Sequence, residues 1–189
     1  MAPSVGRSVD AWGSADRQHE AQWDVVPTSD ASKIILRWKD LCYSVHRRDN
    51  GRLDFPGGKA TPEETPLACA RRELLEEVAF GSVEHAVLCE GLLAQAGTHT
   101  FVFRCPGHQY NITLFGIKWN PQDALGLTPD GAREMMDPAW RTHAEVLQLL
   151  RNDQDGDTSG RAYAAALEDL WAQERGGPDG GRAPAGPPL

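Results

Sequence analysis

The stretch FPGGKATPEETPLACARRELLEEVAF, residues 55–80, carries two adjacent glycines, a proline-rich turn, five glutamates and two adjacent arginines. The pattern predicts a glycine loop that leads into a helix, because Thr65 suits the N-cap and Pro66 suits the first helical position. Apolar residues recur at helical spacing, at Leu67, Ala70, Leu74 and Val78. We therefore expect one face of this helix to pack against a core.

Three glutamates of the same helix, Glu73, Glu76 and Glu77, fall together on another face. Like charges at these spacings destabilise an isolated helix by roughly a few tenths of a kcal/mol per pair. Hard divalent cations offset such repulsion, so the cluster indicates a Mg²⁺ or Mn²⁺ site. Arg72 lies beside Glu76 on the helical wheel and is expected to orient one ligand. An acidic helix face alone is more often simply solvated, so the surrounding residues decide between the two interpretations.

Those residues form a longer pattern: Gly58, five residues, Glu64, seven residues, and then Arg72-Glu73-Leu74-x-Glu76-Glu77. This pattern resembles the signature of the Nudix hydrolase family. The preceding RLDFPGG and the later MMDPAWRTHAEVLQLL are similar to the family's approach strand and to its closing strand and helix, so the resemblance extends from about Ser32 to Trp171. Ala79 stands where the family has a glycine, and we expect Gly81 to end the helix instead, two residues later.

The resemblance implies an α/β fold, a Nudix-type α/β/α sandwich with a central mixed β-sheet, and a pyrophosphohydrolase that acts on phosphoric anhydrides. It implies that Glu73, Glu76 and Glu77 hold the metal together with the carbonyl of Gly57, where a glycine lets the backbone approach closely. Gly58 and Glu64 are expected just outside the metal ligands, and Arg72 is expected to fix the catalytic geometry.

A further carboxylate is expected from the loop before the closing strand, where Glu134 and Asp137 are the alternatives. Solvated loop charges would explain both equally well. Glu73, Glu76 and Glu134 all stay open as the group that removes the proton from the attacking water.

Residues 37–59 carry six Lys and Arg side chains against three acids, in a chain that is acidic overall. We expect this segment to face an anionic substrate, with binding by Arg37, Arg47, Arg48 and Lys59. Exposed strand charges are the alternative explanation.

Composition and charge limit the possible partners, the domain organisation and the location of the protein. Among 189 residues there are 19 Lys and Arg and 27 Asp and Glu, so the formal charge is −8 and a general nucleic-acid surface is disfavoured. We expect an N-terminal extension over residues 1–31, one domain over 32–175, and a disordered Gly/Pro-rich tail over 176–189. No apolar run approaches the roughly 20 residues of a membrane span, and the first residues lack the apolar segment of a secretion signal. These features predict a cytoplasmic protein.

The four cysteines form no pair with metal-type spacing, and buried or idle thiols are expected; they are Cys42, Cys69, Cys89 and Cys105. Runs of β-branched and aromatic residues predict two antiparallel strand pairs, SKIILRWK with LCYSVHRR and THTFVFRC with ITLFGIKW. Apolar residues at helical spacing predict helices over AEVLQLLRN and RAYAAALEDLWAQ.

The substrate is predicted as a class: a small nucleoside diphosphate derivative or a nucleoside triphosphate. A highly phosphorylated inositol or an RNA strand would need a broad basic surface, whereas the basic segment here is short. Diphosphoinositol polyphosphates and capped RNA 5′ ends are the disfavoured alternatives, although the TPEETP turn resembles the EPEEEP turn of diphosphoinositol polyphosphate hydrolases. A hypothesis of another class is a non-catalytic Nudix-like module that binds a nucleotide or a protein, and the complete set of glutamates argues against it.

Overall fold

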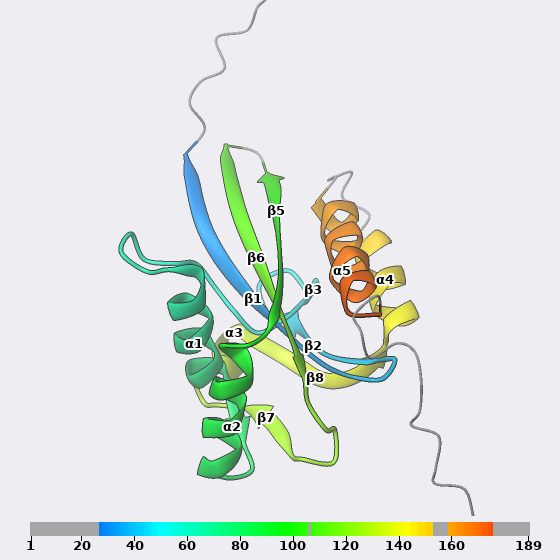
Figure 1. Ribbon diagram of the computed structural model, residues 1–189. Coiled ribbons are helices and arrows are strands. Elements are labelled where there is room, and N and C mark those ends of the chain that lie inside the picture. The colour runs from blue at the N-terminus through cyan, green and yellow to red at the C-terminus, as the bar shows by residue number, and fades with distance from the viewer. Residues whose placement is uncertain (1–26, 106, 153–158, 176–189) are drawn as a thin grey trace, which may run out of the picture.

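A mixed sheet forms the centre of the molecule in the computed structural model, which describes residues 27–105, 107–152 and 159–175 (Figure 1). Its strands are β1 (Thr28–Trp38), β2 (Leu41–Arg47), β3 (Leu53–Asp54), β5 (Gly97–Cys105), β6 (His108–Lys118) and β8 (Met135–Thr142). The order is β3-β2-β1-β6-β5, and β8 also pairs with β2. The long pairing of β1 with β6 is parallel and the other pairings are antiparallel.

Helices cover both faces of this sheet (Figure 1). One layer holds α1 (Pro66–Glu77) and α2 (Val83–Leu93), and the other holds α4 (His143–Arg151) and α5 (Ser159–Arg175). A small ribbon of β4 (Val78–Phe80) and β7 (Leu125–Leu127) and the short helix α3 (Gly131–Glu134) complete the first layer. The α/β/α sandwich with a mixed sheet that the sequence predicted is therefore confirmed.

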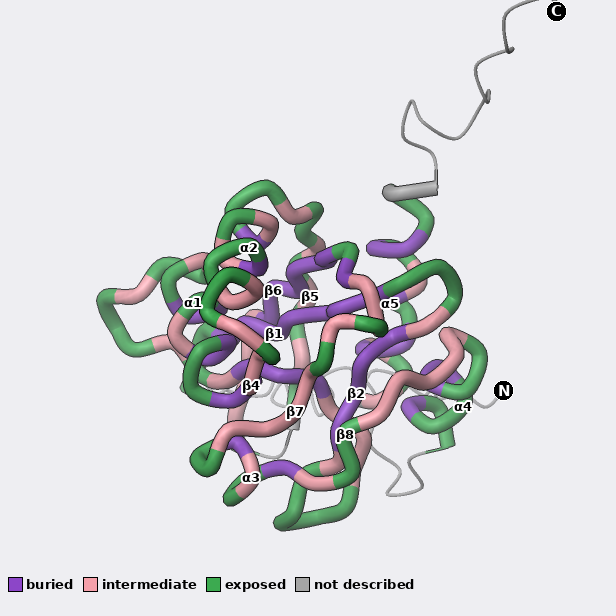
Figure 2. The backbone as a smooth tube through the Cα atoms, turned by 90° about the horizontal axis from the view of Figure 1, so that it is seen from below, coloured by how far each residue is buried: buried purple, intermediate pink, exposed green. Residues whose placement is uncertain are grey.

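The sheet separates two hydrophobic cores because the side chains of β1 alternate between its faces. Ile34 and Leu36 pack with α1 and α2, whereas Ala31 and Ile35 pack with α4 and α5. Every residue from 31 to 37 is buried, and the middle of β1 and β2 is enclosed in the molecule (Figure 2). A strand covered on both faces can present a functional side chain only at an end or beside a gap in the helical layers.

Both predicted strand pairs and both predicted helices are present. Strand β1 begins at Thr28, four residues before the expected domain start at residue 32, and pairs with β6 from its first residue. The rest of the expected extension, up to residue 26, and the expected tail from residue 176 lie outside the described residues. Helix α2 was missed, although Ser82 caps it by accepting from the backbone N–H of His85 at 3.2 Å.

The expected end of α1 at Gly81 is wrong. The helix ends at Glu77, and Val78 is already extended, with φ −105° and ψ 120°. The carbonyl of Glu77 accepts from the N–H of Thr128 at 3.0 Å, and the hydroxyl of Thr128 donates to the carbonyl of Glu76. These bonds and the pairing of β4 with β7 satisfy the terminal backbone groups, so no left-handed residue is needed.

Three cysteines, Cys42, Cys69 and Cys89, are free and buried, as expected. Burial raises the pKa of the Cys89 thiol to about 12. The side chain of Cys105 lies outside the described part of the chain. No helix among the described residues is both long and apolar enough to cross a bilayer.

Helix α4 begins with a capping box that provides a test of the fold. The Thr142 side chain accepts from the N–H of Glu145 at 3.3 Å, and the Glu145 carboxylate accepts from the N–H of Thr142 at 2.8 Å. Thr142→Ala should lower the free energy of unfolding by about 1 kcal/mol, whereas Thr142→Ser should keep most of it. Urea denaturation of both variants measures the difference, and equal stability would show that the cap contributes nothing.

Candidate active site

The two adjacent glycines form a loop that is bonded directly to β1. The N–H of Ile34 donates to the carbonyl of Pro56 at 2.8 Å, and the N–H of Ser32 donates to that of Gly58 at 3.0 Å. Gly57 has φ +132°, and a Cβ there would overlap the carbonyl oxygen of Ser32. A Cβ on Gly58 would overlap the carboxylate of Glu73. The backbone of β1 therefore requires glycine at position 57, whereas a side chain at position 58 would displace the Glu73 carboxylate.

Arg72 on α1 uses all five of its N–H groups. Nε and Nη2 donate to the two carboxylate oxygens of Glu64 at 2.8 and 3.0 Å, and Nη2 also donates to the carbonyl of Lys59 at 3.0 Å. Nη1 donates to Glu73 at 2.7 Å and to Glu76 at 3.0 Å. This pairing lowers the pKa of Glu64 to about 2 and raises that of Arg72. The guanidinium therefore joins the loop, the turn and the acidic helix face.

Two glutamates of α1 are buried and one is exposed. Glu77 is 7% exposed and accepts from the N–H of Gly57 at 2.6 Å, and burial raises its pKa to about 7 against the opposing effect of that bond. Burial also raises the pKa of Glu73. The side chain of Glu76 is 52% exposed. The helix thus places one carboxylate in solvent and two where their negative charge is costly.

Lys33 of β1 is a buried cation on the other side of the glycine loop. Its Nζ donates to Asp54 at 2.7 Å, to the carbonyl of Gly57 at 2.8 Å and to that of Phe55 at 3.1 Å. The three acceptors use the full donor capacity of the ammonium. Lys33 therefore holds residues 54–57 in place against β1 and puts a positive charge near Glu77.

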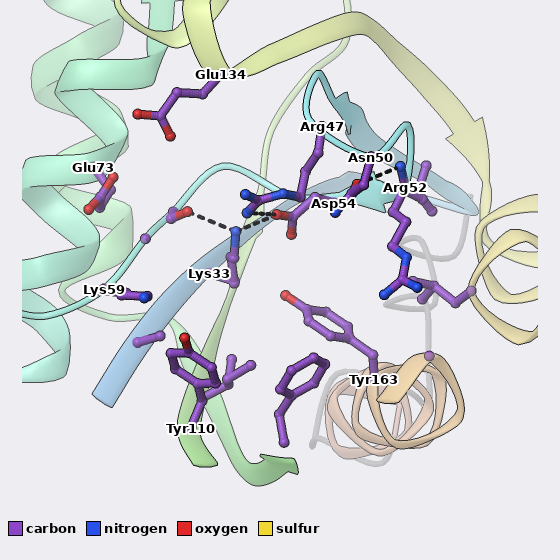
Figure 3. Close-up of a pocket in the computed structure, with 18 of the residues that line it drawn as sticks. Lys33, Arg47, Asn50, Arg52, Asp54, Lys59, Glu73, Tyr110, Glu134 and Tyr163 are labelled. Carbon is purple, nitrogen blue, oxygen red and sulfur yellow. Dashed lines mark hydrogen bonds and ion pairs between the residues drawn. The ribbon is translucent and has the colours of Figure 1, made fainter. Parts of the chain in front are cut away.

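The glycine loop, Lys33, Arg72, Glu73 and Glu76 line a cavity of about 640 Å³ that also reaches the β5–β6 edge of the sheet and α5 (Figure 3). Glu64 and Glu77 do not line it. Its charged residues are Lys33, Arg47, Arg52, Asp54, Lys59, Arg72, Glu73, Glu76 and Glu134. Figure 3 shows Glu73 and Glu134 at one end, Tyr110 and Tyr163 at the other, and Lys33 between them. Side chains of both charge signs thus line the same cavity.

Glu134 and Asp137, in the loop before β8, were the two alternatives for a further carboxylate, and the structure places them differently. Glu134, at the end of α3, lines the cavity, and its side chain makes no hydrogen bond or ion pair with a described residue. Asp137 is exposed, has φ 51° and does not line the cavity. Of the two, only Glu134 is placed to act on a bound molecule.

The four basic residues predicted to bind substrate are also divided. Arg47 and Lys59 line the cavity. Arg37 is 7% exposed and lies over Trp171, 5.5 Å from the ring centroid, because four residues of strand carry it about 13 Å beyond Lys33. Arg48 points away and donates to the carbonyl of Ala132 at 2.7 Å. Neither Arg37 nor Arg48 lines the cavity, so of the four expected residues the structure brings only Arg47 and Lys59 to it.

Several lining residues were not predicted, namely Lys33, Arg52, Asp54, Phe103, Tyr110 and Tyr163. Lys33 left a usable signal, since a lysine within the apolar run of a buried strand needs a partner. Tyr163 left none, because it lies on the apolar stripe of α5 and looks like an ordinary core residue.

The expected metal ligands are chemically suited to a hard divalent cation. Glu73, Glu76, Glu77 and the carbonyl of Gly57 offer only oxygen, which suits Mg²⁺ or Mn²⁺ better than softer metals. In the described part of the chain, however, no three His, Cys, Asp or Glu side chains converge as metal ligands do. The reason is that Arg72 holds Glu73 and Glu76 while Gly57 holds Glu77.

Comparison with known proteins identifies this architecture. Residues 19–162 match the model of the NUDIX domain. The chain belongs to the Nudix family, and it is a Nudix-type hydrolase, an enzyme that acts on phosphoric anhydrides. No curated protein matches it in sequence at a significant level.

Solved structures share the fold at low sequence identity. The MutT protein from Methanosarcina mazei Go1 is 18% identical with a TM-score of 0.53, over 79% of this chain and 96% of that chain. A NUDIX hydrolase from Nitrosomonas europaea is 19% identical with a TM-score of 0.51, over 85% and 99%. A bifunctional NMN adenylyltransferase/ADP ribose pyrophosphatase from Francisella tularensis is 18% identical with a TM-score of 0.54, over 78% of this chain and only 43% of that one.

The glycine loop yields a stability prediction with a matched control. Gly57→Ala should lower the free energy of unfolding by about 3 kcal/mol or more, because the added Cβ meets the backbone of β1. Gly51→Ala also places alanine at a positive φ, of +68°, but has no heavy atom within 4 Å of the added Cβ, so it should cost only about 1 kcal/mol. Denaturation of both variants isolates the overlap, and equal losses would contradict it.

Proposed function

We propose that the chain is a divalent-cation-dependent hydrolase that cleaves the diphosphate linkage of a nucleoside diphosphate derivative or a nucleoside triphosphate. One observation carries the proposal: Glu73 and Glu76 of the acidic helix and the ammonium of Lys59 line the same cavity. Lys59 makes no ion pair with a described residue, and its ammonium lies over the ring of Tyr110 in a cation–π contact, with Nζ 5.1 Å from the centroid. This contact leaves the N–H groups of Lys59 to donate to a phosphate oxygen.

Glu73, Glu76, Glu77 and the carbonyl of Gly57 would hold the cation. When bound, Mg²⁺ or Mn²⁺ would neutralise charge on the diphosphate and lower the pKa of the attacking water. Arg72 and Glu64 would keep the carboxylates in position, because their two-bond pairing fixes the guanidinium relative to α1. Arg47 would add positive charge at the cavity wall, partly screened by Asp49, to which it donates at 2.7 and 2.9 Å.

Glu134 is the proposed proton acceptor. Hydrolysis forms a bond from a water oxygen to one phosphorus, breaks the bond from that phosphorus to the bridging oxygen, and releases a proton from the water. Glu73 and Glu76 are engaged by Arg72, whereas Glu134 makes no such pairing and its carboxylate points toward the same end of the cavity as Glu73 (Figure 3). An unpaired carboxylate is the better base of the three.

The nucleotide class is supported by charge and by one structural neighbour. A chain of charge −8 with about half of its predicted basic residues turned away from the cavity is poorly suited to a polyphosphorylated inositol or to RNA. The Francisella tularensis protein of similar fold was solved in complex with AMP and a Mn ion. That chemistry agrees with an oxygen-only metal site beside a phosphate-binding lysine.

A substrate screen tests the function directly. Nucleotide sugars, dinucleoside polyphosphates, nucleoside triphosphates, diphosphoinositol polyphosphates and capped RNA would each be assayed with Mg²⁺ or Mn²⁺ for release of phosphate or mononucleotide. We expect a small nucleotide to have the highest kcat/KM and activity to disappear in excess chelator. Undiminished turnover with chelator, or at least about tenfold preference for inositol or RNA substrates, would refute the proposal.

Two variants separate metal binding from proton transfer. Glu76→Gln and Glu134→Gln should each lower kcat by about a hundredfold or more without loss of fold, since both side chains are exposed. Glu76→Gln should also weaken Mn²⁺ binding measured by calorimetry, whereas Glu134→Gln should leave it nearly unchanged. Glu63→Gln, an exposed residue of the preceding turn, is the control for charge loss. Near-normal turnover in either test variant would remove that residue from the mechanism.

A further inference from the structure

Lys33 differs from the other cations of the cavity because oxygen atoms enclose its charge. The acceptors around its Nζ are the Asp54 carboxylate at 2.7 Å, the carbonyl of Gly57 at 2.8 Å and that of Phe55 at 3.1 Å. We call these three oxygens the oxygen cage. A carboxylate and two backbone carbonyls are also the kinds of ligand that a hard metal ion takes from a protein. The ammonium therefore occupies a place whose surroundings suit a metal ion.

The oxygen cage is held by bonds that do not involve the lysine side chain. The other carboxylate oxygen of Asp54 accepts from the N–H of Phe55 at 2.8 Å. The carbonyl of Pro56 accepts from the N–H of Ile34 at 2.8 Å, which fastens the loop to β1. Because these bonds remain when the side chain of Lys33 is shortened, we expect the cage to keep its shape without the ammonium.

Gly57 connects the oxygen cage to the acidic helix. Its carbonyl accepts from Lys33, and its N–H donates to the Glu77 carboxylate at 2.6 Å. Both charged side chains are buried, with 9% of Lys33 and 7% of Glu77 exposed. Lys33 therefore acts on Glu77 through the backbone of one residue as well as through its nearby charge.

The ammonium of Lys33 also borders the space in which a substrate would bind. Lys33 lines the cavity, and Figure 3 shows it between the end with Glu73 and the end with Tyr163. Its three acceptors use all of its N–H groups, so it contributes charge to the cavity rather than a hydrogen bond. A compact ammonium on the chain is a point charge that is present at every metal concentration.

We propose that Lys33 is a built-in cation of the hydrolytic site. Its ammonium fills an oxygen cage that would otherwise take up a further divalent cation, and through Gly57 it positions the Glu77 carboxylate. The inference rests on the proposed function and deepens it, because part of the positive charge beside the diphosphate then comes from the chain itself. The protein accordingly binds one divalent cation fewer than the same oxygens would bind without the lysine.

Two substitutions of Lys33 test whether the cage accepts a metal ion. Lys33→Ala empties the cage, whereas Lys33→Met fills it with an apolar chain of similar length. Calorimetric titration with Mn²⁺ should show one more bound ion in Lys33→Ala than in the wild type, and the wild-type number in Lys33→Met. Lys59→Ala is the control for loss of a cavity lysine and should keep the wild-type number, since that ammonium lies over the ring of Tyr110. Equal numbers in Lys33→Ala and the wild type would overturn the proposal.

Thermal unfolding gives a second measurement on the same pair of variants. Both leave Asp54 with Arg47 as a weaker partner, at 3.8 Å, so Tm in chelator should fall in both. Added Mn²⁺ should then raise Tm by about 5 °C more in Lys33→Ala than in Lys33→Met, because a bound ion stabilises only the variant with an empty cage. Equal shifts would contradict a cage that a metal ion enters.

Lys33→Gln tests the charge alone and covers the case in which Lys33→Ala does not fold, since an amide still donates to the cage. Mn²⁺ affinity at the acidic helix should rise by about tenfold, because a nearby positive charge is removed. At saturating Mn²⁺, kcat should fall by about tenfold or more, because the diphosphate loses the same charge. Structural damage would lower both quantities, so a joint loss, or no change in either, would refute the assignment.

The gain of one ion also distinguishes this inference from the function on which it rests, because counting bound Mn²⁺ needs no turnover. If the wild type hydrolyses no nucleotide with any metal and Lys33→Ala still gains an ion, the proposed function is refuted and the cage is supported. If the wild type is a metal-dependent nucleotide hydrolase and Lys33→Ala gains no ion, the function stands and the assignment of Lys33 is refuted.

Discussion

The guanidinium of Arg72 is the constraint on which the site depends. A planar fork with five donors is satisfied by three acidic side chains and one carbonyl, which come from the turn at Glu64, the loop at Lys59 and α1 itself. A lysine could not replace it, because an ammonium has three donors and no plane to match a carboxylate. Since the loop is also bonded to β1, the position of one side chain fixes the acidic helix against the centre of the sheet.

This arrangement leaves charge that the described residues only partly neutralise. Arg72 serves Glu64, Glu73 and Glu76, and Lys33 serves Asp54, so Glu77 is left with a backbone N–H and a nearby ammonium. Burial then raises the pKa of Glu77 to about 7, and Glu73 moves in the same direction. A group of buried carboxylates with weak compensation binds a cation more readily than a fully paired network would. Under the proposed function, a bound divalent cation would offset this negative charge.

How much of this the sequence predicts depends on whether the cause is local. The cap at Thr65, the proline at the first helical position and the buried stripe through Ala70 and Leu74 follow from neighbouring residues, and all are present. The helix end was missed because Thr128, about fifty residues away, completes the last turn. The role of Arg37 was missed because position along a strand, rather than charge, decides which end of β1 reaches the cavity.

The residues that line the cavity also divide into those that lie close together in the sequence and those that only the fold brings together. The residues proposed for catalysis lie almost entirely within residues 57–77, so a contiguous pattern reveals them. The lining residues Phe103, Tyr110 and Tyr163 come from β5, β6 and α5, which meet because β6 pairs in parallel with β1 and α5 packs on β5. No spacing in the sequence encodes that meeting. A change in one of these elements would therefore alter the shape of the cavity wall without touching the acidic helix.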